Sequence, residues 1–214
     1  MKKEDDGYPV TLKIDLPGKE LNRLTTAFRI FMLVPIAIVI GLLAGASTGW
    51  DWGHAGRPGW QTGVAAGGVL FLPTLLMILF RQKYPRWWFD WNVQFLRFCL
   101  RVGVYAALLT DVYPSTDEEQ TVHLKVAYPD AKKDLSQWLP LVKWFLAIPH
   151  LFVLGFLGIA AWVCVVIAWF AILFTGRYPK ALAAFVAGVM RWGVRVCAYA
   201  FLLVTDEYPP FSLD

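Results

Sequence analysis

Long apolar runs alternate along the chain with shorter segments that mix apolar and charged residues. In the first half, residues 28–47 contain one charge, Arg29, and residues 60–80 contain none. Each run can cross about 30 Å of hydrocarbon as a helix. The segment between them, residues 48–59, is polar and rich in glycine, which is typical of a turn. We therefore expect a transmembrane helical hairpin over residues 28–80.

The second half holds one longer apolar stretch, residues 139–175, which only Lys143 and His150 interrupt. As a single helix it would be about 55 Å long, well beyond the thickness of one bilayer. We therefore expect a second hairpin that turns near residues 155–161. Its arms would be short, which implies local thinning of the bilayer or incomplete crossing.

Motifs recur in the same order in the two halves, which indicates an internal duplication. Leu12-Lys13-Ile14 recurs as Leu124-Lys125-Val126, and Thr110-Asp111 recurs as Thr205-Asp206. Further matched pairs are Arg29 and Lys143, Pro35 and Pro149, Arg97 and Arg191, Arg101 and Arg195, and Tyr105 and Tyr199. The first copy has 20 additional residues, which fall at its polar turn. We expect two tandem repeats, residues 1–114 and 121–214, joined by an acidic linker, 115–120.

Each repeat is expected to begin with a short β-strand and to end with an amphipathic helix after its hairpin, which makes the fold mainly α. The strands, residues 10–16 and 121–128, show β-branched alternation closed by a proline. Pairing between them outside the membrane would cover edges that are otherwise exposed. The helices, residues 86–109 and 180–204, each follow a Tyr-Pro dipeptide.

The two amphipathic helices either lie in the membrane interface or cross the bilayer. Crossing would place arginines at mid-depth, at a cost of about 2.5–3.5 kcal/mol each. If only the hairpins cross, 19 of the 20 Lys and Arg residues fall on one side and Arg57 alone on the other, as the positive-inside rule favours. We favour this multi-pass arrangement in the inner membrane, with both termini cytoplasmic. The alternative, in which the helices cross and the repeats are inverted, stays open.

Composition supports the membrane assignment. The chain of 214 residues is 57% hydrophobic and 17% charged, with 11 Trp, and its mean hydropathy is +0.50. These values exclude a disordered chain and argue against a water-soluble one. The net charge of +4 comes from basic residues that flank apolar runs. It therefore favours anionic lipid over nucleic acid as partner.

Small residues recur at four-residue spacing in the predicted first hairpin, at Gly41, Gly45, Gly63 and Gly67. This spacing lets helices approach closely, so we expect these glycines to pack the two arms together.

Candidate chemistry is sparse. No catalytic, phosphate-binding or dinucleotide-binding motif occurs. Asp51 and His54 in the polar turn are too few to form a metal site. The sequence therefore predicts no enzyme, no metal and no cofactor.

Two arginine pairs are the strongest candidate binding residues. Arg97 and Arg101, like Arg191 and Arg195, are one helical turn apart, so each pair projects from one helix face. Paired guanidinium groups suit phosphate, and we expect them to bind headgroups of anionic phospholipid. An alternative stays open, in which Asp111 and Asp206 pair with these arginines and tie each helix to its exit loop.

The second repeat resembles a known family. Residues 170–179 read FAILFTGRYP, residues 205–213 read TDEYPPFSL, and residues 145–151 read FLAIPHL. With Arg191 and Arg195 between them, these motifs resemble the bacterial membrane family called domain of unknown function four-three-eight-nine. The first repeat is a degenerate copy. The resemblance implies an integral membrane protein and supplies no catalytic residues.

Two functions are compatible with these observations. We expect a non-catalytic integral membrane module, a scaffold or accessory subunit of a membrane complex with anionic-lipid contacts and a membrane protein as partner. The alternative is a small lipid or solute translocator built from two inverted three-helix repeats. The side of the membrane on which residues 112–137 lie would distinguish them.

Overall fold

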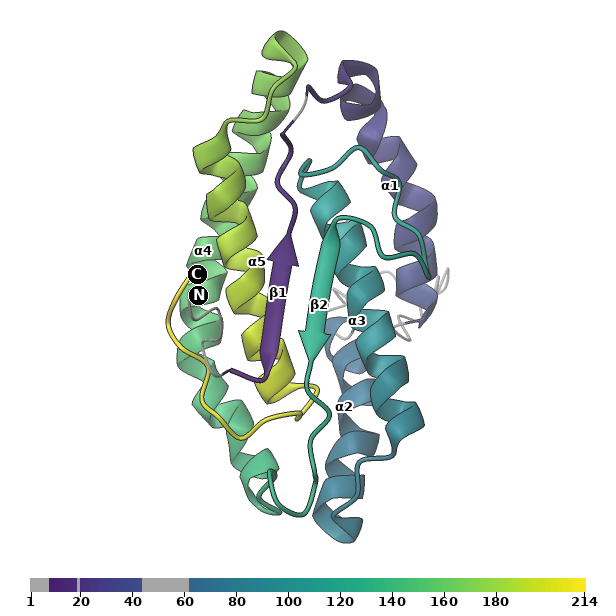
Figure 1. The fold of residues 1–214 in the computed structure, drawn as a ribbon, viewed down its shortest axis with the longest axis vertical. Helices are drawn as coiled ribbons and strands as arrows, with labels where there is room; N and C mark the ends of the chain where they lie inside the picture. Colours follow the sequence, from purple (N-terminus) through teal and green to yellow (C-terminus); the bar gives the residue numbers. More distant parts are fainter. Residues whose placement is uncertain (1–7, 19, 44–61) are drawn as a thin grey trace, which may run out of the picture.

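The computed structural model describes residues 8–18, 20–43 and 62–214, which form five helices and two strands (Figure 1). The strands are β1 (Val10–Ile14) and β2 (Val122–Val126). The helices are α1 (Arg23–Leu43), α2 (Thr62–Arg81), α3 (Arg86–Ala106), α4 (Leu139–Thr175) and α5 (Lys180–Ala200). The protein is thus mainly helical, as the sequence predicts.

The two strands pair with each other, which confirms that prediction. They are antiparallel, with Val10 opposite Val126 and Ile14 opposite Val122. Alternate residues of β1 are buried and exposed, as expected for a sheet with one solvated face. The buried face packs on two helices, β1 on α5 and β2 on α3 (Figure 1). The main apolar core lies between the sheet and these helices.

The second predicted hairpin, over residues 139–175, is wrong. These residues form a single helix, α4, which has 37 residues and is about 55 Å long. Gly155 and Gly158, at the predicted turn, lie inside α4. The turn segment has no Pro, Asn or Asp, and breaking a helix in a bilayer would leave unpaired backbone groups. The helix ends instead at Gly176, whose φ of 73° is the left-handed conformation that closes many helices.

The first predicted hairpin, over residues 28–80, is also wrong, because α1 and α2 do not fold back on each other. Just before α1, the Leu21 N–H donates to the Gly176 carbonyl oxygen at the end of α4 (2.8 Å). Near the end of α2, the Leu79 carbonyl oxygen accepts from the Gln137 side chain just before α4 (2.7 Å). These contacts lie at opposite ends of a helix about 55 Å long. Together, α1 and α2 therefore run along α4 in the opposite direction (Figure 1).

The amphipathic helices α3 and α5 are slightly shorter than predicted, ending at Ala106 and Ala200 rather than at residues 109 and 204. After each helix a buried leucine takes a positive φ, 64° at Leu108 and 55° at Leu203. This conformation is unusual for a side chain of that size. Both turns lead into the Thr-Asp motif that follows.

Within the described ranges, three helices are long and apolar enough to cross a membrane. They are Arg23–Gly41 of α1, the whole of α4, and α5. Most exposed large apolar side chains lie on α1, α2 and α4. In α5, by contrast, half of the residues in its apolar part are buried. The chain thus has the helices of a membrane protein.

Candidate functional site

A buried cation joins the start of α1 to the loop after α3. Arg29 is 2% exposed and lies 2.5 Å from the carboxylate of Asp111. It also donates to the carbonyl oxygens of Tyr105 (2.9 Å) and Thr110 (2.8 Å), and its guanidinium lies 4.4 Å from the centroid of the Tyr105 ring. The Asp111 carboxylate accepts the Asn22 N–H, at 2.7 Å. One ion pair thus holds the helix start and the exit loop together.

The second half contains the corresponding arrangement. Lys143 of α4 is fully buried, and its Nζ lies 2.7 Å from the carboxylate of Asp206. It donates to the Thr205 carbonyl oxygen (2.6 Å) and lies 5.1 Å from the centroid of the Tyr199 ring. The Asp206 carboxylate accepts the Ser136 N–H, at 2.6 Å. Each contact repeats one made by Arg29 or Asp111, at the position matched in sequence.

The two aspartates therefore have partners that the sequence analysis did not assign. Asp111 and Asp206 pair with Arg29 and Lys143 rather than with the arginines of α3 and α5. A sequence signal existed, because a charge inside an apolar run needs a counter-ion. Arg29 and Lys143 are such charges, at matched positions.

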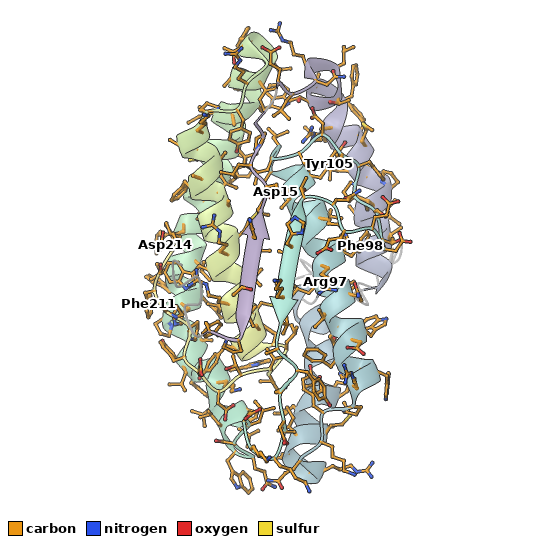
Figure 2. All side chains as sticks on the ribbon, in the orientation of Figure 1. Asp15, Arg97, Phe98, Tyr105, Phe211 and Asp214 are labelled. Carbon is orange, nitrogen blue, oxygen red and sulfur yellow. The ribbon has the colours of Figure 1, made fainter. Side chains whose placement is uncertain are left out.

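The arginine pair of α3 binds backbone carbonyl groups. Arg97 lies beside β2 (Figure 2) and donates to the Leu124 carbonyl oxygen at 2.8 Å. Arg101 is 4% exposed and donates to the carbonyl oxygens of Glu118 (2.6 Å) and Thr116 (2.8 Å). Burial, and then the charge of Arg97, lower the pKa of Arg101 below its usual value, although an arginine stays charged at neutral pH. The pair holds α3 against the sheet and against the acidic linker, residues 115–120.

The arginine pair of α5 binds the C-terminal segment, residues 208–214, in the same manner. Arg191 donates to the Leu213 carbonyl oxygen at 2.9 Å. Arg195 is 8% exposed and donates to the carbonyl oxygens of Ser212 and Asp214. Each predicted pair thus shares one helix face, and its donors contact carbonyl oxygens. Arg97 and Arg191 are half-buried, so they are the two members with surface left for a headgroup.

His150 anchors the C-terminal segment to α4. Its ring is fully buried and accepts the Trp192 indole N–H through Nδ1, at 3.1 Å. It stacks on Phe211, with centroids 3.9 Å apart, and lies 4.7 Å from the ring of Tyr208. Phe211 and Asp214 lie on the α4 and α5 side of the molecule (Figure 2). His150 is therefore a packing residue between a helix and the segment that folds over it.

The structure separates the glycines that were expected to pack a hairpin. Gly41 lies near the end of α1, and Gly63 and Gly67 lie in α2, which continues along α4 instead of folding back. Gly45 lies outside the described residues. Close helix packing by these glycines therefore stays a prediction, although the hairpin to which it was assigned does not form. Asp51 and His54 also lie outside them. Among the residues that are described, no three His, Cys, Asp or Glu side chains are grouped to hold a metal ion.

One stretch of the chain contains three features of the second half: the ion pair of Lys143 with Asp206, the pair of Arg191 and Arg195, and His150. This stretch can be compared with known families. Residues 140–212 match the family described as Domain of unknown function (DUF4389). This confirms the resemblance predicted from the sequence. The DUF4389 match begins inside α4 and covers about a third of the chain, so it includes neither strand. No curated protein and no solved structure matches the chain.

Proposed function

We propose that the protein is a non-catalytic integral membrane module, a scaffold or accessory subunit of a membrane complex, with one face embedded in the inner membrane. The observation that carries the proposal is the separation of apolar and polar surface. Along α4, Phe145, Phe156 and Phe174 are 72%, 62% and 78% exposed. The outer face of the sheet instead exposes Thr11 and Lys13. Soluble proteins rarely expose so large an apolar surface.

The sheet favours one orientation of this module. It lies midway along α4 (Figure 1), so an upright α4 would carry the sheet into the hydrocarbon. Open sheet edges and exposed charges such as Lys13 and Lys125 are not tolerated there. We therefore place α1, α2 and α4 parallel to the membrane plane, in place of the membrane-crossing hairpins that the sequence analysis favours, with the sheet and both termini on the cytoplasmic side. This keeps nearly all basic residues on one side, as the sequence analysis favours.

We further propose that the chain consists of two tandem units, each a strand, a long apolar helical row and an amphipathic helix. Support comes from the matched ion pairs, Arg29 with Asp111 and Lys143 with Asp206. An approximate two-fold axis through the sheet would relate the units, since β1 and β2 are antiparallel and so are the two apolar rows. In the flat orientation this axis is the membrane normal, so both units face the cytoplasm.

Anionic phospholipid is the proposed lipid partner on that side. Arg97 and Arg191 are half-buried and keep donors beyond those that bind carbonyl groups. Lys132, exposed shortly before α4, adds positive charge, whereas the Arg177 guanidinium just after α4 is paired with the Glu20 carboxylate at 3.0 Å. Each basic residue near an anionic surface contributes about 1 kcal/mol of attraction. A partner membrane protein would contact the same face, as expected for an accessory subunit.

One observation favours a second candidate, a small lipid or solute translocator. The α1 and α2 row runs opposite to α4 (Figure 1). If both rows crossed the bilayer, the two units would be inverted repeats, an architecture common in transporters. The sheet would then have to be shielded from lipid by another copy or by a partner.

Cysteine accessibility distinguishes the two orientations. In a variant whose own three cysteines are replaced by alanine, K132C and R177C probe opposite ends of α4, and T11C probes the sheet. The flat orientation predicts labelling of all three by a membrane-impermeant maleimide from the cytoplasmic side. Labelling of positions 132 and 177 from opposite sides would contradict the embedded-face proposal and support the translocator.

A further inference from the structure

We propose that the groove between α1 and α4 binds one acyl chain of a membrane phospholipid. The proposal rests on the membrane function proposed above and assigns a lipid site distinct from the arginine pairs. The groove has a volume of about 400 Å³ and is lined by α1, α4 and the end of α3. This volume lies within the range of ligand pockets, about 300–1,000 Å³.

The walls of the groove are apolar, and their polar groups are directed elsewhere. Ile30 of α1, Ala106 of α3 and Val166 of α4 face the space. The Trp169 indole N–H, which also lies on the wall, donates to the Thr26 carbonyl oxygen at 3.1 Å. Arg29 at one end is held by Asp111. A ligand here gains apolar contact and little else, which selects a hydrocarbon chain.

The size and surroundings of the groove select the occupant. One turn of a helix about 10 Å wide and 5.4 Å long fills roughly 420 Å³, so the groove would hold no more than a single turn of a partner helix. A flexible acyl chain can follow it lengthwise. Both flanking helices expose large apolar side chains, such as Ile30 and Trp162, so in the embedded-face orientation the groove opens toward bilayer lipid, whose acyl chains are present at high concentration.

A second groove at the matched position supports a built-in site. It lies between the start of α4 and the end of α5 and has a volume of about 320 Å³. Three of its lining residues match lining residues of the first groove: Trp144 with Ile30, Ala147 with Leu33, and Ala200 with Ala106. The buried cation Arg29 lines the first groove, and the buried cation Lys143 directly precedes Trp144, which lines the second. The hollow therefore recurs with the local architecture that creates it.

Photocrosslinking tests the site. The protein is reconstituted in bilayers that contain phosphatidylcholine with a diazirine on its acyl chain, and crosslinked residues are mapped by mass spectrometry. We expect crosslinks at residues 162–170 to exceed those at residues 152–159, on the open face of α4, by about fivefold, a preference equivalent to about 1 kcal/mol. Ala106→Trp, which fills the groove from an exposed position, should abolish this excess. Ile159→Trp, which is exposed outside both grooves, should leave it unchanged.

The outcomes separate this site from the membrane function. Crosslinking that is uniform along α4, and that Ala106→Trp does not alter, would overturn the acyl-chain site. It would leave the embedded-face proposal intact. An absence of crosslinks along the whole of α4 would overturn the embedded face as well. Ile30→Trp fills the groove from α1, where the side chain is 69% exposed, and provides the same test if Ala106→Trp does not fold. A loss of the excess in either folded variant supports the site.

Discussion

Neutralising Asp206 should destabilise the protein by about 3 kcal/mol. Lys143 is fully buried and has two oxygen partners, the Asp206 carboxylate and the Thr205 carbonyl. Asp206→Asn leaves the ammonium group buried without its counter-ion, which typically costs about 3–5 kcal/mol. The Asp206 side chain is 19% exposed, so water relieves part of this cost, and the lower end of the range applies. In a chain of this size, 3 kcal/mol corresponds to a fall in melting temperature of about 6–12 °C.

The first half supplies a matched control. After Asp111→Asn, Arg29 keeps two carbonyl oxygens, whereas Lys143 keeps one after Asp206→Asn, and both cations keep their contact with a tyrosine ring. One charged hydrogen bond is lost, worth about 1.5–3 kcal/mol, and the Asp111 side chain is 28% exposed. We therefore expect Asp111→Asn to cost about 2 kcal/mol, less than Asp206→Asn.

Equilibrium unfolding in mixed micelles, followed by tryptophan fluorescence, measures these differences. The double variant Lys143→Met with Asp206→Asn removes the stranded charge and should be more stable than Asp206→Asn alone. The reasoning is refuted if Asp206→Asn costs no more than Asp111→Asn. It is equally refuted if removing Lys143 fails to restore stability.

Three further predictions concern the sheet, the C-terminal segment and the arginines. Hydrogen bonds to Glu119 and Asp15 raise the pKa of His123 above its ordinary 6.5, so its contribution to stability is complete below pH 6.5 and is lost as the pH rises through the raised value. The melting temperature of wild type minus that of His123→Gln should be larger at pH 5.5 than at pH 8.5, and an equal difference would contradict this. A Cβ at Gly188 would lie 2.8 Å from the Leu213 carbonyl oxygen, whereas one at Gly193 would meet nothing within 4 Å. Gly188→Ala should therefore cost about 1–3 kcal/mol and speed amide exchange at residues 208–214, and Gly193→Ala should be neutral or stabilising by up to about 1 kcal/mol. Arg97→Gln with Arg191→Gln should reduce co-purified phosphatidylglycerol and lower the melting temperature less than Arg101→Gln with Arg195→Gln, which removes the more buried pair. Unchanged phosphatidylglycerol after Arg97→Gln with Arg191→Gln would contradict the headgroup assignment.

The local elements could be predicted because their signals are short-range. Alternation over residues 10–16 predicts β1, and the Tyr-Pro dipeptides before residues 86 and 180 mark the starts of α3 and α5. Strand pairing followed from the need to cover two isolated edges. The ends of α3 and α5 were less accurate, because Leu108 and Leu203 take a left-handed conformation that no residue-type signal announces.

The hairpins could not be predicted correctly from run length. A mostly apolar stretch of 37 residues was compared with the thickness of a bilayer, which assumes that a helix stands upright. The length of α4 instead matches the combined length of α1 and α2 beside it. Gly176, just after α4, bonds to Leu21 before α1, and Gln137, just before α4, bonds to Leu79 near the end of α2. Such long-range contacts have no signature in a local window of sequence.

The partners of Asp111 and Asp206 illustrate the same limit at the candidate site. Helical spacing identified the arginine pairs of α3 and α5, but nearness in sequence suggested the wrong carboxylates for them. In the structure these arginines donate to backbone carbonyl oxygens, and the carboxylates of Asp111 and Asp206 pair with Arg29 and Lys143. Backbone acceptors carry no sequence signal, because every residue has one.

The buried face of α4 can be recognised from its few polar and small residues, although the length of the apolar run does not reveal it. The residues that α4 buries include Lys143, Ala147 and His150, which follow one another at helical spacing of four and three. In a soluble helix the apolar stripe marks the buried face. In α4 the exposed residues are the apolar ones, and the polar and small residues mark the face that packs on α5 and the C-terminal segment. In a membrane protein an ionisable residue within an apolar helix is expected to face the protein interior. The positions of Lys143 and His150 in the sequence therefore indicate which face of α4 packs against the rest of the protein. Arg29 carries the same information for α1, where it is buried against the loop after α3. The few polar residues of the apolar runs, rather than the lengths of the runs, therefore determine how the apolar helices attach to the rest of the molecule.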